Sequence, residues 1–97
     1  MKTLRLIVHK RWFDAIASGT KREEYRTLSH YWTVRLMDGS LPKKFDAVVF
    51  RNGYHRDAPT IEREHLGTTI GCGNQIWGAP SHPVYMIALG SVIRHDS

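Results

Sequence analysis

The strongest constraint on the fold is the predicted strand at residues 45–50, which ends in the unbroken apolar run Val48, Val49 and Phe50. Successive side chains of a strand point to opposite faces, so an unbroken apolar run predicts a strand that is buried on both faces. The chain has 97 residues, which is the length of one compact domain with a single core. We therefore predict one domain over residues 1–97, in which other elements cover both faces of this strand.

The pattern of apolar and turn-forming residues predicts four further strands, at residues 3–8, 20–26, 60–69 and 84–93. It also predicts a helix at residues 10–18 that ends at Gly19, and a second helix at 30–36 that begins after the N-cap residue Ser29. The strand at 60–69 is polar, and we therefore expect it to be exposed.

Five strands and two short helices with many non-local pairings predict a small α+β barrel, and the competing prediction is an open sheet of four strands. Residues 38–42 and 71–83 carry the glycines and prolines of loops, and Gly90 is a candidate break in the last strand.

The net charge of +5 is concentrated near the beginning of the chain. Residues 1–36 hold eight Lys or Arg and three acids, whereas residues 37–97 hold six of each. A one-sided excess of positive charge favours a polyanionic partner. A solubilising surface accounts for the same charge equally well.

The segment 19–26 combines a helix stop with a lysine, a glutamate and an arginine. Lys21 offers a mobile charge for a phosphate, and Arg26 offers a planar fork for a phosphate or a base edge. Glu24 can hold either cation, accept from a nucleobase amino group or act as a general base. In a regular strand Lys21 faces away from Glu24 and Arg26, so their convergence requires a turn or a bulge between Lys21 and Glu24. The alternative is a solvated strand edge with an ion pair worth about 0–1 kcal/mol.

A second polar segment, residues 51–54, follows the apolar strand. Arg51 is suited to a phosphate, Asn52 to a base edge and Tyr54 to stacking on a base, an interaction worth about 1–3 kcal/mol. Asn-Gly is also a common turn dipeptide, so a turn that ends the strand is the alternative interpretation.

Gly19, Lys21, Glu24 and Arg26 spell the pattern G-x-K-x-x-E-x-R. This pattern resembles the signature of the ASCH domain, a branch of the PUA-like barrel superfamily, and the preceding strand and helix stand where that family has them. Three later segments also look like those of small ASCH proteins of bacteria and their phages, namely residues 51–54, 57–59 and 77–79. The resemblance therefore covers most of the chain.

The resemblance implies a small PUA-like β-barrel with a cleft beside the motif, and a role that is linked to RNA. With this interpretation, the cleft binds RNA or a nucleotide through Lys21, Glu24, Arg26, Arg51, Asn52 and Tyr54.

The resemblance also leaves an enzymatic alternative open. Some ASCH-like proteins resemble amidohydrolases that remove an acetyl group from modified cytidine with a lysine, a threonine and a glutamate, and others have been proposed as ribonucleases. Lys21 matches the lysine, whereas Glu24 stands where those proteins carry the threonine. A carboxylate is a poor substitute for a hydroxyl nucleophile in acyl transfer. If the chain is an enzyme, Lys21 and Glu24 are its candidate catalytic pair.

Several other classes of protein do not fit the sequence. The six histidines show no zinc-ligand spacing and Cys72 is the only cysteine, so we expect no metal site and no cofactor. No run approaches the ~18 apolar residues of a membrane span, and residues 1–13 do not resemble a signal peptide. We therefore expect a cytoplasmic protein without a membrane partner. A non-catalytic domain with a protein partner is a third hypothesis, which rests only on small size and exposed charge.

Overall fold

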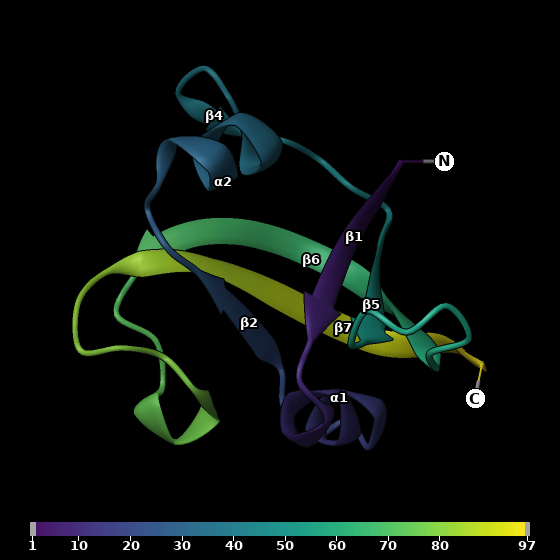
Figure 1. Ribbon diagram of the computed structural model, residues 1–97. Coiled ribbons are helices and arrows are strands. Elements are labelled where there is room, and N and C mark those ends of the chain that lie inside the picture. Colours follow the sequence, from purple (N-terminus) through teal and green to yellow (C-terminus); the bar gives the residue numbers. More distant parts are fainter. Residues whose placement is uncertain (1, 97) are drawn as a thin grey trace.

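Five strands form one mixed sheet in the computed structural model, which describes residues 2–96 (Figure 1). Their spatial order is β1 (Thr3–Val8), β5 (Ala47–Asn52), β6 (Thr60–Gly71), β7 (Val84–Asp96) and β2 (Glu23–Arg26). Strands β1 and β5 are parallel, and the other three neighbouring pairs are antiparallel. The sheet curls into a half barrel whose two edges are β1 and β2.

Irregular pairing between the two longest strands accompanies this curl. The register of β6 against β7 shifts between Glu62 and Arg63, between Arg63 and His65, and between His65 and Gly67. An extra residue on one strand of a pair bends the ladder and increases its twist. The long β6–β7 ribbon can therefore wrap around the core instead of remaining flat.

Two helices cover the opposite ends of the half barrel (Figure 1). Helix α1 (Lys10–Ala17) buries Phe13 and Ile16, which stand three residues apart and so share one face. It ends before Gly19, whose φ of 83° lies in the left-handed region that favours glycine. Helix α2 (His30–Leu36) begins after Ser29, whose hydroxyl accepts a hydrogen bond from the Trp32 backbone N–H.

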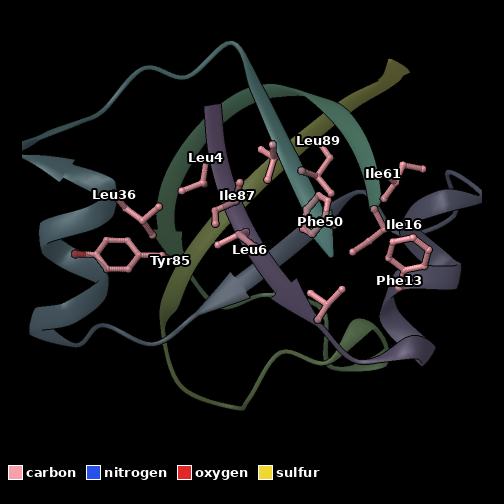
Figure 2. Close-up of a cluster of buried hydrophobic side chains, with 12 residues drawn as sticks. Leu4, Leu6, Phe13, Ile16, Leu36, Phe50, Ile61, Tyr85, Ile87 and Leu89 are labelled. Atoms are coloured by element: carbon pink, nitrogen blue, oxygen red, sulfur yellow. The ribbon is translucent and has the colours of Figure 1, made fainter. Parts of the chain in front are cut away.

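The core lies between these helices and the inner face of the sheet (Figure 2). Twelve buried apolar side chains from α1, α2 and four of the five strands form it, namely Leu4, Leu6, Val8, Phe13, Ile16, Leu36, Val48, Phe50, Ile61, Tyr85, Ile87 and Leu89. The Tyr85 hydroxyl reaches the α2 end of the core, where it lies 2.6 Å from the Thr33 hydroxyl. The hydroxyl group of this buried tyrosine therefore has a hydrogen-bond partner.

The predicted α+β class, with five strands, two short helices and a barrel-like sheet, is confirmed. The prediction of an exposed strand at 60–69 is wrong, because β6 is the central strand of the sheet and buries Ile61, Arg63 and Thr68. The last strand also continues through Gly90.

Two segments that were predicted as loops contain short regular elements. Strands β3 (Met37–Asp38) and β4 (Leu41–Pro42) pair as a small hairpin, and a 3₁₀ helix, η1 (Gln75–Trp77), lies between β6 and β7. Within residues 2–96, no helix has the length and the apolar character needed to cross a membrane.

Candidate functional site

A cleft of about 420 Å³ opens at the carboxyl end of β1, next to α1 and β2. Figure 1 shows that both edge strands connect directly to α1 in this region. The residues that line the cleft are Ile7, Val8, His9, Trp12, Lys21, Glu24, Tyr25, Arg26, Tyr54 and Gly78. They include the three charged side chains of the G-x-K-x-x-E-x-R pattern.

Lys21 lies in the connection between α1 and β2 and not in the strand itself. Its backbone N–H donates to the Ala15 carbonyl at 3.0 Å, which holds this connection against the last turn of the helix. The side chain is only 1% exposed, and its ammonium group lies 4.1 Å from the centre of the Trp12 ring and 3.1 Å from Glu24 Oε1. The predicted turn or bulge between Lys21 and Glu24 is absent, since the turn lies at Ser18–Gly19. Lys21 can face Glu24 because it stands in irregular chain before β2, where strand alternation does not apply.

The carboxylate of Glu24 forms ion pairs with two positively charged side chains. Its Oε1 faces Lys21, and its Oε2 lies 2.6 Å from Nη2 of Arg26. Arg26 Nη2 also donates to the Ile7 carbonyl at 3.1 Å, and the guanidinium lies over the Trp32 ring at 4.8 Å. With Glu24 itself 6% exposed, the three residues form a largely buried triad with one negative and two positive groups.

Burial governs the electrostatics of this triad. Desolvation by burial lowers the pKa of Lys21 below its ordinary value of 10.5, and the charge and hydrogen bond of Glu24 oppose that change. The positive charges of Arg26 and Arg11 add to the lowering. The ammonium group of Lys21 is therefore easier to deprotonate than that of a solvated lysine, which is typical of functional sites.

The loop between β6 and β7 rests on two aromatic rings of the site. The Tyr25 hydroxyl donates to Glu23 at 2.9 Å and accepts from the backbone N–H of Asn74 at 3.1 Å. Gly78 has a φ of 98°, and a Cβ atom built there would lie 2.8 Å from the Trp12 ring. A side chain at position 78 would therefore collide with the ring on which Lys21 rests.

Of the residues that the sequence nominated, Lys21, Glu24, Arg26 and Tyr54 meet at this cleft. Tyr54 is 84% exposed and reaches the rim because the Gly53 N–H donates to the Val8 carbonyl at the end of β1.

The other two nominated residues lie elsewhere. Arg51 lines a different hollow on the outer face of the sheet, where it donates to the His55 carbonyl. Asn52 is the last residue of β5, and its backbone N–H donates to the Pro59 carbonyl. The structure therefore does not bring Arg51 and Asn52 into the cleft with Lys21.

Two residues with important positions were missed by the sequence interpretation. Trp12 packs against the core, and its ring also lies beneath the ammonium group of Lys21 in the cleft. Arg63 is 4% exposed and donates to the carbonyls of Ile16, Lys21 and Gly90 at 3.1, 2.6 and 2.9 Å. The sequence feature that indicates burial of Arg63 is its position two residues after the apolar Ile61, because residues two apart in a strand share one face.

A broader hollow of about 830 Å³ lies on the other side of Tyr25 and is lined in part by Arg63. Because Arg63 is already hydrogen-bonded to three carbonyl groups, it has less capacity for a ligand than the Lys21 triad. We therefore consider the smaller cleft the better candidate.

Among residues 2–96, no three side chains of His, Cys, Asp and Glu gather in a way that could hold a metal ion. Cys72 is a free and exposed thiol. Comparisons of the chain with models of known protein families, with curated proteins and with solved structures gave no significant match.

Proposed function

We propose that the chain is an RNA- or nucleotide-binding domain of the ASCH type, and that the cleft at Lys21 is its ligand site. The observation that carries this proposal is the triad of Lys21, Glu24 and Arg26, which is largely buried and opens beside the exposed ring of Tyr54. The triad has a formal charge of +1, which attracts phosphate strongly where water is partly excluded. An exposed tyrosine at the rim supplies a surface on which a base can stack.

The triad also offers groups that can distinguish one nucleotide from another. Arg26 Nε is buried and has no hydrogen-bond partner among the described residues. Unsatisfied buried donors are uncommon and costly, so an acceptor from a ligand would relieve this cost. The Glu24 carboxylate can accept from the amino group of a base, as carboxylates do from cytosine in nucleic-acid complexes.

The test is a binding titration with a short single-stranded RNA and with nucleoside monophosphates. We expect Lys21→Met to weaken binding of both ligands and to lower the dependence of RNA affinity on salt, by about 0.7 in the log–log slope. Lys10→Met is the matched control, because Lys10 is an exposed lysine that is paired with Asp14 on the outside of α1. Equal affinities of the wild type and Lys21→Met for both ligands would contradict the proposal.

A second candidate function is an enzyme that acts on RNA or on a modified nucleoside. The observation in its favour is that Lys21 has a lowered pKa and lies 3.1 Å from a carboxylate, so the pair can exchange a proton with a bound substrate. Incubation with acetylated cytidine and with labelled RNA tests it. Product formation that disappears in both Lys21→Met and Glu24→Gln supports catalysis, and its absence excludes these substrates.

A further inference from the structure

The hollow that Arg51 lines on the outer face of the sheet has a volume of about 370 Å³. Three arginines line it, namely Arg5, Arg51 and Arg56, and Ile7 and Val49 contribute apolar walls. We call this surface the arginine hollow. None of its lining residues is acidic, so its formal charge is +3.

The strand register explains why two of these arginines meet. Leu4, Leu6 and Val8 of β1 point into the core, so Arg5 and Ile7 point outward. Ile7 pairs with Arg51 in the parallel β1–β5 ladder, so the outward side chains of both strands share one surface. Arg56 comes from the turn that follows, where the His55 carbonyl accepts from the Arg51 guanidinium.

The three arginines have no acidic partners of their own. None of them takes part in an ion pair among residues 2–96. A neighbouring hollow on the same face, which Arg5 also lines, contains Glu62 and the ion pair between Arg94 and Asp96. Positive charge without nearby acidic groups is therefore concentrated at Arg51 and Arg56, and Arg5 lies between them and the acidic side of this face.

The arginine hollow adjoins the cleft at Lys21. Ile7 lines both of them. The turn that carries Arg56 also carries Tyr54, which lines the cleft. A linear ligand that places one group beside Lys21 can therefore continue past Tyr54 and reach the three arginines.

We propose that the arginine hollow binds backbone phosphates of a single-stranded RNA, one nucleotide of which occupies the cleft at Lys21. This inference rests on the proposed function and makes it more specific, because it identifies the ligand as a strand and not as a free nucleotide. Arginines suit this role because the planar guanidinium can donate two parallel hydrogen bonds to one phosphate. The apolar walls leave room for the sugar and for an unstacked base.

The experiment compares an RNA of about eight nucleotides with nucleoside monophosphates, since single-strand sites span about 4–16 nucleotides. The variants are Arg51→Gln combined with Arg56→Gln, and separately Arg5→Gln, whose exposed side chain makes no hydrogen bond among residues 2–96. The matched control combines Arg22→Gln with Arg94→Gln, which removes the same charge from exposed positions outside the hollow.

Each lost phosphate contact should reduce the log–log salt slope by about 0.7. If the affinities are equal at 1 M salt, a variant that lacks one contact should therefore bind about fivefold more weakly than the wild type at 0.1 M salt. We therefore expect a loss of about 25-fold for the double variant and about fivefold for Arg5→Gln. Binding of monophosphates should not change, and the control should bind RNA like the wild type.

The outcomes separate this inference from the proposed function. If RNA binds no more tightly than a monophosphate and the arginine variants do not change RNA affinity, the inference of an RNA strand is wrong. A nucleotide site at Lys21 remains compatible with that outcome. If the arginine variants weaken RNA binding but Lys21→Met does not, the arginine hollow stands and the proposed cleft is wrong. If the wild type binds neither ligand, both proposals fail.

Discussion

The guanidinium of Arg26 donates a 3.1 Å hydrogen bond to the carbonyl of Ile7, and this bond joins the two edge strands of the sheet. Ile7 belongs to β1 and Arg26 to β2, which stand at opposite ends of the strand order. The same nitrogen binds Glu24 at 2.6 Å. Arg26 therefore closes the open side of the half barrel and also contributes to the charge of the candidate site.

The first prediction concerns this connection. Arg26→Gln should lower the free energy of unfolding by about 2–3 kcal/mol, because it leaves the Ile7 carbonyl and one oxygen of Glu24 without a partner. Urea unfolding measures the change. Arg94→Gln is the control, since Arg94 forms an exposed ion pair and its loss should cost less than about 1 kcal/mol. Equal losses in the two variants would show that the edges do not depend on Arg26.

The second prediction concerns Arg63, which connects α1, the Lys21 segment and β7. Arg63→Met should cost about 3 kcal/mol or more, because two buried carbonyl groups and a third, partly buried one lose their donor. Arg22→Gln removes an exposed arginine near the same hollow and should change stability by less than about 0.5 kcal/mol. An unfolding midpoint for Arg63→Met that equals the wild-type midpoint would refute this structural role.

The third prediction follows from the lowered pKa of Lys21. The folded state binds protons at Lys21 less strongly than the unfolded state, so the free energy of unfolding rises with pH between the lowered pKa and 10.5. Burial raises the pKa of Tyr25 above its ordinary value of 10.0. Tyr25 therefore lowers the free energy of unfolding as the pH rises, but only above about pH 10.0. As the pH rises from neutral toward 10.0, the wild type should therefore gain stability relative to Lys21→Met. Urea unfolding at a series of pH values tests this, and parallel pH profiles would contradict it.

The fourth prediction separates binding from stability at Tyr54. Because its side chain is 84% exposed, Tyr54→Ala should leave the unfolding midpoint unchanged. The loss of a stacked base should weaken RNA binding by about 1–3 kcal/mol, or roughly 5- to 150-fold. Tyr31→Ala, at a tyrosine of α2 that is 60% exposed, is the control for a general loss of surface aromatic groups. Titration of a labelled RNA measures both variants, and equal effects would argue against a specific role of Tyr54.

Local patterns were sufficient to predict much of the fold. The helix stop at Gly19 and the cap at Ser29 depend on neighbouring residues, and the structure has both. The predicted strand at 45–50 is present as β5, although β5 continues to Asn52 and Val49 on its outer face is only half-buried. Side-chain alternation also implied that Lys21 cannot lie in a regular strand with Glu24 and Arg26, and Lys21 indeed lies outside β2, although no turn separates it from Glu24. These features could be predicted because backbone geometry and side-chain alternation determine them within a few residues.

Contacts between distant segments could not be predicted in this way. Arg63 was interpreted as part of an exposed polar strand, but its partners are carbonyls 27 to 47 residues away. Arg51 and Tyr54 were assigned to one site, yet the strand end turns Arg51 to the outer face and Tyr54 to the cleft. The order of the strands, and the side to which residues at a strand end point, depend on pairing between distant segments and are determined only when the whole sheet has formed.

The spatial order of the strands also determines when the candidate site can form. Lys21, Glu24 and Arg26 are synthesised well before β7, but β2 pairs with β7 and β1 pairs with β5. A nascent chain that has not yet reached Val84 therefore lacks the partner strand that holds Glu24 and Arg26. Non-local pairing of this kind is slow because the intervening chain must first be ordered. Assembly of the triad consequently reports that synthesis and folding of the last strand are complete, so a truncated chain would carry the motif without the site.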